Sequence, residues 1–444
     1  MSWFAILTIS LIAARALAQI SLDRLNRRHV LSNAKAVPQA FRELIDPATY
    51  TKSVDYTLAK SQLHCTEVIY DALVLLGILF SGVLPTTYFF WTSRVGLSAW
   101  SQAAWLFLVG LALAAVSLPL DWYGQFRLEE RFGFNTTTAR LWIIDHLKGL
   151  LVALVLGYPL LVLVLKIVEW TGGVWWLWAW GALLGFQLLM LVLAPVLIMP
   201  LFNKFTPLPE GRLRQRLFQL AHRTGFRAQS IQVMDGSKRS RHSNAFFTGF
   251  GKFRKIVLFD TLVQQLSEPE LEAVLAHEIG HYKRKHIVKF LGVSAAGSLL
   301  AFAILAVLAR QPWFYTAFGF APGGIVPALL LFSLLSGVVS FWLTPIINVW
   351  SRRYEYEADA FAAKAMQEPQ PLIGALRKLN EKNLSNLTPH PIYSGFYYSH
   401  PTLLERENSL ALARQESPAT APFSSRPDSR GNRSAPAAPA PRAP

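Results

Sequence analysis

Long apolar segments restrict this chain more than any other feature. About seven stretches are each apolar over about 20 residues, the length that an α-helix needs to cross a ~30 Å hydrocarbon core. Inside a bilayer only helices and closed barrels satisfy every backbone polar group, so helices of this length predict a membrane bundle. With 52% apolar and 16% charged residues, the chain does not have the composition of an ordinary soluble protein. The stretches lie at 2–21, 66–91, 97–120, 147–168, 174–200, 288–310 and 324–350.

The first stretch, 2–21, has two interpretations. Arg15 interrupts its apolar run, and residues 16–18 (ALA) resemble a signal-peptidase site. No basic residue precedes the run, however, as a signal peptide requires. We therefore predict that this stretch is a retained membrane span.

The basic residues predict the orientation of the bundle. If the N-terminus lies outside, the inner segments are 22–65, 121–146, 201–287 and the chain after residue 350, and these carry nearly all the Lys and Arg. This distribution follows the positive-inside rule and predicts an N-out, C-in topology. The net charge of +16 then indicates attraction to anionic lipids of the inner leaflet. Because no nucleic-acid-binding motif accompanies the charge, we expect the lipid bilayer as a partner and no nucleic acid.

Residues 277–281 read HEIGH, directly before the sixth apolar stretch. Histidines at i and i+4 share one helix face, so His277 and His281 can bind one zinc ion through their imidazoles. Glu278 projects about 100° round the helix, toward the open position of the metal. There it can act as the general base for a zinc-activated water. The motif predicts a metallopeptidase.

The residues before the motif predict the helix that it needs. Ser267 and Glu270 have the spacing of a capping box, and Pro269 fits the first helical turn. An apolar stripe then runs into His277.

A third zinc ligand must come from elsewhere, because a catalytic site uses three protein ligands and keeps one position open. The only cysteine, Cys65, lies in an apolar stretch, which disfavours a thiolate ligand. Glu355 and Asp359 follow the seventh stretch and are themselves i and i+4. Glu355 can bind zinc while Asp359 accepts a hydrogen bond from the far nitrogen of a zinc histidine. Glu357 is the competing ligand.

These motifs resemble the M48 family of integral-membrane zinc metalloproteases of the Ste24 type (CAAX prenyl protease 1-like). The matching segments keep the order of the family, and RFGFNTTT is the weaker match. They are RFGFNTTT at 131–138, PLFNKFTPLPEGRL at 200–213, SKRSRHSNAFFTGF at 237–250, HEIGH at 277–281, SRRYEYEADAFA at 351–362 and YSHPTLLER at 398–406.

The resemblance implies a role for each matching residue. It implies zinc bound by His277, His281 and Glu355, with Glu278 as general base. Asn244 and Ala245 fall where the family presents an edge strand to the substrate backbone, which suits an extended peptide. His400 and Arg406 fall near the scissile carbonyl, where a donor or cationic side chain would stabilise the oxyanion. Two further histidines near the motifs, His242 and His286, are interpreted as structural or solvated.

The predicted fold is a multi-span α-helical membrane protein of about seven transmembrane helices. Its α+β zincin-type metalloprotease domain lies at the cytoplasmic side, with short strands expected at 231–234 and 255–259. The expected parts are an N-terminal membrane region of five spans at 1–200, catalytic portions at 201–287 and 351–415, spans six and seven at 288–350, and a disordered Pro/Ala/Ser/Arg-rich tail at 416–444.

The predicted function is that of a membrane zinc endopeptidase acting on membrane-associated or prenylated peptides and proteins. The resemblance leaves two substrate classes open: eukaryotic relatives cut prenylated C-termini, and bacterial relatives are associated with membrane-protein quality control. We favour the second, with CAAX processing as the alternative. The membrane would be the inner or plasma membrane of a bacterium or the endoplasmic reticulum of a eukaryote. The non-enzyme alternative is a membrane scaffold or a metal-handling transporter. The centres of spans six and seven hold no ionisable residue, which disfavours a transporter.

Overall fold

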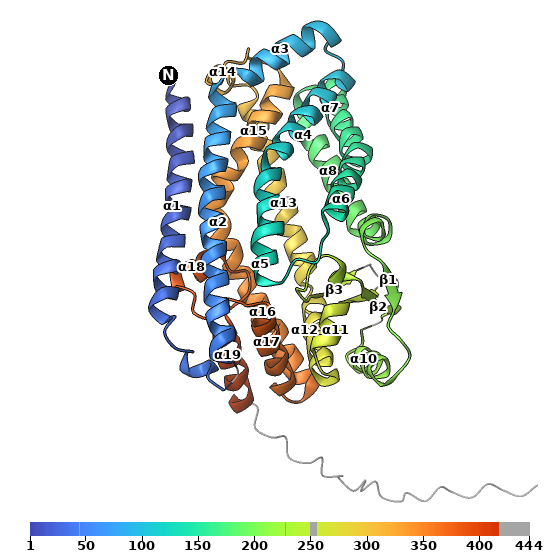
Figure 1. Ribbon diagram of the computed structural model, residues 1–444. Helices are drawn as coiled ribbons and strands as arrows, with labels where there is room; N and C mark the ends of the chain where they lie inside the picture. The colour runs from blue at the N-terminus through green and yellow to red at the C-terminus, as the bar shows by residue number, and fades with distance from the viewer. Residues whose placement is uncertain (44, 227, 249–254, 417–444) are drawn as a thin grey trace, which may run out of the picture.

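The computed structural model is a tall bundle of helices with a small sheet and several short helices at one end (Figure 1). It describes residues 1–43, 45–226, 228–248 and 255–416. The tail predicted at 416–444 therefore lies outside the described residues, apart from its first position.

The predicted multi-span architecture is confirmed. Among the described residues, six helical stretches are long and apolar enough to cross a membrane, and they carry exposed apolar side chains such as Trp170, Leu300 and Ile346. The helices are α1 (Trp3–Asn33), α2 (Pro47–Phe80), α4 (Ala99–Tyr123), α6 (Ala139–Val152), α7 (Tyr158–Thr171), α8 (Trp175–Leu193), α13 (His286–Leu308), α15 (Ile325–Ser340) and α16 (Thr344–Met366).

The longest apolar stretch, residues 139–202, contains a reversal of the chain. Gly172 follows α7 with φ 56°, and α8 then returns in contact with α7. This φ lies in the region that glycine adopts without the steric cost that other residues meet. The stretch therefore supplies two of the seven predicted passes.

The second predicted span, 66–91, was wrong in its bounds. The helix α2 ends at Phe80, Gly82 has φ 77°, and α3 (Val83–Val95) begins as a separate helix that lies across the end of the bundle (Figure 1). In the other direction α2 extends back to Pro47 within a segment predicted as a loop. The apolar stretch at 66–91 thus indicates which residues are apolar enough for a lipid environment, but it does not indicate where the helix begins or ends.

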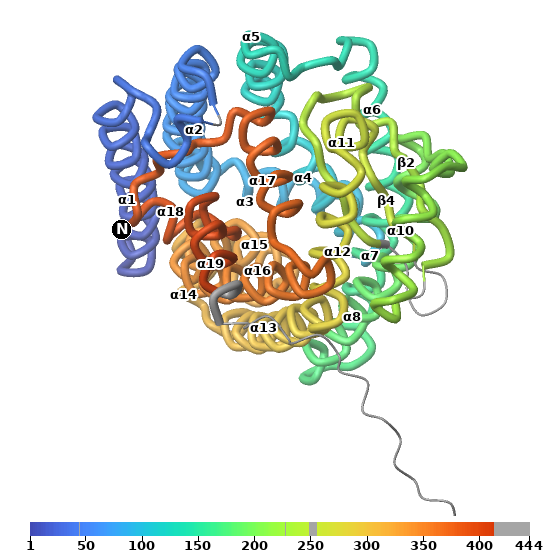
Figure 2. The backbone as a smooth tube through the Cα atoms, turned by 90° about the horizontal axis from the view of Figure 1, so that it is seen from below, coloured from blue at the N-terminus to red at the C-terminus, as the bar shows by residue number. Residues whose placement is uncertain are grey.

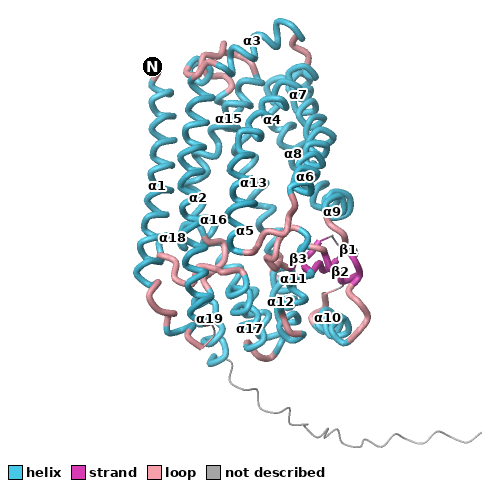
Figure 3. The backbone as a smooth tube through the Cα atoms, viewed as in Figure 1, coloured by secondary structure: helices cyan, strands magenta, loops and turns pink. Residues whose placement is uncertain are grey.

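The sheet lies at one side of the lower end of the bundle (Figure 3). Its strands are β1 (Phe205–Pro207), β2 (Ser230–Met234), β3 (Ala245–Thr248) and β4 (Lys255–Phe259), in the order β1-β2-β4-β3. The parallel pair β2 and β4 forms the centre, and β1 and β3 join it antiparallel. The two predicted strands are present as β2 and β4.

Several helices pack around α12 (Glu268–Lys283). It contacts α10 (Arg212–Arg223), α16 and α17 (Gln370–Lys382), and the sheet edge β3. Figure 2, seen from below, shows α12, α16 and α17 inside the outline that the membrane helices form. The short helices are α5 (Glu130–Phe132), α9 (Met199–Phe202), α11 (Asp260–Gln265), α14 (Pro312–Thr316), α18 (Pro391–Tyr397) and α19 (Leu403–Glu416).

Candidate active site

The helix α12 begins with the predicted capping box. The backbone N–H of Ser267 donates to the Glu270 carboxylate at 2.7 Å, and Pro269 occupies the first turn. Lys378 from α17 donates to the same carboxylate at 2.7 Å. The Glu270 carboxylate therefore has two roles. It caps α12, whose first amides have no partner inside the helix, and it connects α12 to α17 through Lys378.

Gly280, inside the HEIGH motif, lets α12 approach α16 closely. A Cβ at this position would lie 3.0 Å from Cα and 3.1 Å from the carbonyl oxygen of Ala358. Ala358 is fully buried. The two backbones meet one residue before His281 and one residue before Asp359, so the close approach brings the two motifs face to face.

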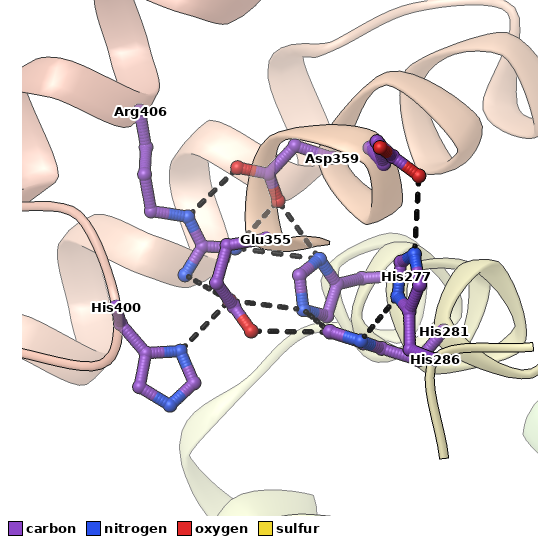
Figure 4. Close-up of polar contacts among 8 residues, drawn as sticks. His277, His281, His286, Glu355, Asp359, His400 and Arg406 are labelled. Atoms are coloured by element: carbon purple, nitrogen blue, oxygen red, sulfur yellow. Dashed lines mark hydrogen bonds and ion pairs between the residues drawn. The ribbon is translucent and has the colours of Figure 1, made fainter. Parts of the chain in front are cut away.

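His277, His281 and Glu355 form one group of potential metal ligands, with all their ligand atoms within 4.8 Å of one another. The Nε2 atoms of the histidines are 3.2 Å apart. Glu355 Oε1 lies 3.1 Å from Nε2 of His281, and Oε2 lies 3.5 Å from Nε2 of His277. Figure 4 shows the three side chains converging. Two imidazoles and one carboxylate are a usual donor set of a catalytic zinc site.

Asp359 lies behind His277. Its Oδ1 is 2.8 Å from His277 Nδ1, and Arg406 donates to both carboxylate oxygens at 2.8 and 2.5 Å. Asp359 is 1% exposed and Arg406 is 8% exposed. Since a carboxylate accepts, Nδ1 of His277 carries the hydrogen and Nε2 faces the ligand group.

His400 and Arg406 approach Glu355 from different sides. Nδ1 of His400 lies 2.8 Å from Glu355 Oε2, and its side chain is 64% exposed. Arg406 Nη1 lies 3.7 Å from the same oxygen, but its side chain is buried. His400 therefore lies at the exposed rim of the site and Arg406 in its interior. Figure 4 shows the two side chains approaching Glu355 from different directions.

Glu278 is half-buried, and its carboxyl lies close enough to the ligand side chains for their charges to act on it. Burial raises the pKa of Glu278, and the imidazoles of His277 and His281 oppose that shift without cancelling it. A carboxylate with a raised pKa is a stronger base, which suits proton abstraction near neutral pH.

The pKa of His277 is also shifted. Burial alone would lower it, but Asp359 and Glu355 outweigh burial and raise the pKa of His277 to about 9. The carboxylates thus favour positive charge at this ring. A divalent cation bound by the ligand group would take the place of that proton, because a histidine ligand must be deprotonated at the coordinating nitrogen.

Glu357, the competing ligand, lies outside the ligand group. Its carboxylate is 3.2 Å from Nε2 of His286 and 3.5 Å from Nε of Arg353. His286 is 1% exposed, and its Nδ1 lies 3.0 Å from Nδ1 of His281. Sequence reasoning gave His286 no contact with the metal site, and the only signal was its position five residues after His281.

Asn244 and Ala245 lie at the edge of the sheet. Within the described part of the sheet, β3 pairs with β4 alone, and Ala245 is its first residue. Asn244 is exposed, and its side-chain oxygen accepts a hydrogen bond from Ala245 N–H at 2.8 Å. The strand also contacts α12. An extended peptide added to β3 would lie alongside the helix that carries HEIGH.

A cavity of about 780 Å³ has both polar and apolar lining residues, which include Glu129, His242 and Thr402. A second cavity of about 400 Å³ shares His64 with the first. His242 lies 3.2 Å from Glu129 and 3.1 Å from Asn383, so it is held by structural contacts.

The family models match nearly the whole chain in two parts. The model described as "CAAX prenyl protease N-terminal, five membrane helices" matches residues 26–204, and the model described as "Peptidase family M48" matches residues 207–413.

Several curated proteins are similar to this chain over most of their own length. CAAX prenyl protease 1 of Saccharomyces cerevisiae is 37% identical over 430 residues, which cover 90% of this chain and 94% of the relative. The CAAX prenyl protease 1 homolog of Homo sapiens is 33% identical over 439 residues, covering 88% and 91%. Among solved structures, S. mikatae Ste24p matches with a TM-score of 0.83 and 36% identity, covering 91% of this chain and 98% of that one.

Proposed function

The chain belongs to the M48 family of membrane metalloendopeptidases, of the CAAX prenyl protease 1 type, and from this premise we propose that it cleaves prenylated CAAX proteins with one zinc ion held by His277, His281 and Glu355. The observation that carries the proposal is the convergence of these three side chains from α12 and α16. When bound, zinc would polarise the scissile carbonyl and make a water molecule more acidic.

The protein supplies the proton transfer. Glu278 accepts a proton from the attacking water as oxygen adds to the carbonyl carbon, and it later delivers that proton to the leaving amine. The burial that raises the pKa of Glu278 supports this role. Because the proton is passed from water to amine, Glu278 ends the cycle ionised as it began.

His400 and Arg406 take different parts in the proposal. His400 is exposed at the rim and points toward the ligand group, so it can donate a hydrogen bond to the oxyanion of the tetrahedral intermediate. Arg406 is buried and donates twice to Asp359. We give Arg406 a positioning role: it holds Asp359, and Asp359 holds His277.

The substrate backbone would pair with β3 next to Asn244 and Ala245. Main-chain hydrogen bonds to an edge strand bind an extended peptide with little dependence on its side chains. β3 contacts α12, so a peptide on this edge lies near Glu278.

Prenylated substrates are favoured over general membrane-protein quality control. The curated relatives in yeast, rice and humans share the name CAAX prenyl protease 1. Their identity to this chain extends over both the membrane helices and the peptidase part. The substrate class that we first favoured from the sequence thus gives way to its alternative.

The active site would face the cytoplasm, with the N-terminus outside. HEIGH precedes α13 and Glu355 follows the apolar part of α16, so the site lies at one end of the bundle (Figure 1). The basic residues 283–285 and 352–353 flank it. The positive-inside rule places such residues on the cytoplasmic side.

The test is a comparison of two peptides that differ only in a farnesyl group on the CAAX cysteine. Purified enzyme in detergent is expected to cleave the farnesylated peptide with a much higher kcat/KM, with Glu278→Gln as the inactive control. Equal cleavage of both peptides by the wild type would contradict the proposed substrate class. Cleavage by Glu278→Gln would contradict the proposed base.

A further inference from the structure

We propose that His286 and Glu357 form a positioning chain that fixes the tautomer and ring orientation of the metal ligand His281. The inference rests on the proposed zinc site and adds two residues to it. Neither residue would touch the metal or the substrate. Both would act through the imidazole of His281.

The distances define an unbranched chain of contacts. His281 Nε2 lies in the ligand group, while its other ring nitrogen, Nδ1, is 3.0 Å from Nδ1 of His286. Nε2 of His286 is in turn 3.2 Å from Glu357 Oε2. Each imidazole thus uses one nitrogen on each side, and the chain ends on a carboxylate.

The chemistry of these atoms determines every hydrogen in the chain. A histidine that binds a metal through Nε2 carries its hydrogen on Nδ1. His281 Nδ1 must then donate, so Nδ1 of His286 accepts and its Nε2 carries the hydrogen. That N–H donates to Glu357, which as a carboxylate can only accept. With one hydrogen on His286, both contacts are satisfied only when His281 has the tautomer that zinc requires.

The same arrangement holds the other histidine ligand. His277 donates from Nδ1 to Asp359, which Arg406 holds from behind. Among the described residues, no carboxylate contacts Nδ1 of His281 directly, and His286 connects this nitrogen to Glu357. A far-nitrogen acceptor of a zinc histidine typically contributes 10–100-fold to metal affinity or activity. The two ligands would therefore be oriented by two separate chains.

Local structure places His286 in this position. Lys285 adopts the left-handed conformation, φ 58°, between α12 and α13, so the helix is interrupted there and His286 is the first residue of α13. The ring of His286 stacks on Tyr354 of α16, with centroids 4.1 Å apart and an interplanar angle of 12°. His286, at the start of α13, is thus packed against α16 and is 1% exposed.

This placement links the metal site to the membrane helices. His286 belongs to α13, Glu357 belongs to α16, and His281 belongs to α12. A relative shift of α13 and α16 would change the acceptor of His281 without moving His281 itself.

The experiment measures zinc affinity by chelator competition on the purified full-length protein. His286→Phe keeps an aromatic ring over Tyr354 but removes the acceptor, and it is expected to weaken zinc binding by about 10–100-fold. His286→Asn keeps an acceptor near the position of Nδ1, so its affinity is expected to lie clearly closer to that of the wild type. Glu357→Leu is expected to show a smaller loss than His286→Phe, because it acts one contact further away.

Tyr354→Leu is the matched control, since it removes the stacking and leaves the two polar contacts of the chain in place. Its zinc affinity is expected to stay near that of the wild type. Equal losses in Tyr354→Leu and His286→Phe would overturn the inference, because packing alone would then explain them. Equal losses in His286→Phe and His286→Asn, or no loss in His286→Phe, would overturn it as well.

The assay separates this inference from the proposed function. If wild type binds zinc and cleaves the farnesylated peptide while His286→Phe binds zinc equally tightly, only the positioning chain fails. If the wild type binds no zinc, the proposed function and the inference both fail.

Discussion

Gly280→Ala tests whether the close approach of α12 and α16 assembles the site. The added Cβ would lie 3.0 Å from Cα of Ala358, 3.1 Å from its carbonyl oxygen and 3.2 Å from Cβ of Phe361. Ordinary contacts of a Cβ lie at 3.4–4 Å. The nearest atoms belong to backbone, so no side chain can rotate away. The helices must separate by several tenths of an ångström.

The magnitude has two opposing parts. Overpacking of a tight core contact costs about 1–3 kcal/mol. Replacing a helical glycine by alanine returns roughly 1 kcal/mol through helix propensity. Gly395→Ala, in α18, is the matched control, because no atom lies within 4 Å of its added Cβ. The difference in unfolding free energy between the two variants therefore isolates the steric part, about 1–3 kcal/mol.

The separation also acts on the metal site. His281 is the next residue after Gly280, and Glu355 lies one turn before Ala358. A shift of α12 away from α16 moves both histidines away from Glu355, so zinc affinity is expected to fall in Gly280→Ala and to stay unchanged in Gly395→Ala. Thermal unfolding in detergent and chelator competition measure the two effects. Equal stability and equal zinc affinity of both variants would refute the reasoning.

Three further predictions concern charges. Arg406→Met removes the buried partner of Asp359. Because a buried charge then loses its counter-ion, the free energy of unfolding is expected to fall by about 3–5 kcal/mol. A fall of under about 1 kcal/mol in denaturant titrations would contradict this prediction. Asp359 and Glu355 raise the pKa of His277 to about 9, and His277 must release a proton to bind zinc. The apparent zinc affinity, measured by chelator competition, should therefore fall about tenfold per pH unit below that value. A zinc affinity independent of pH between about pH 8 and 6 would contradict this prediction. Burial opposes ionisation of Glu270, but the hydrogen bonds from Lys378 and Ser267 outweigh burial and lower the pKa of Glu270 from 4.5. The ionised carboxylate therefore stabilises the folded state above pH 4.5. This contribution is lost as the pH falls through the lowered pKa. The difference in unfolding free energy between wild type and Glu270→Gln should therefore shrink below about pH 4.5, and a difference independent of pH would exclude this account.

The core of the site could be predicted because its geometry is local. The i,i+4 spacing places His277 and His281 on one face of α12, and the same spacing places Glu355 and Asp359 on one face of α16. Glu357, two residues from Glu355, points elsewhere on the helix and binds His286 instead. What sequence spacing cannot supply is the close approach of α12 to α16, which depends on Gly280 and Ala358.

Other features depend on contacts that no periodicity reports. The helix ends between His281 and His286, and the left-handed Lys285 turns His286 back toward the site. If the helix continued unbroken from His281 to His286, the two imidazole rings would lie on different faces of that helix. Likewise, the sequence predicts the same role for Arg406 and His400, but their burial differs. Arg406 lies in the interior of the site, and His400 lies at its rim. The break of the second span at Gly82 depends on a single backbone conformation.

The most direct test of the central claim measures zinc content and peptide cleavage together in the wild type and in Glu278→Gln. The account predicts one zinc ion per chain in both proteins, with cleavage of a farnesylated CAAX peptide in the wild type alone. Absence of zinc from wild type purified without chelators would contradict the assignment of His277, His281 and Glu355. Zinc in both proteins with equal cleavage would contradict the assignment of Glu278.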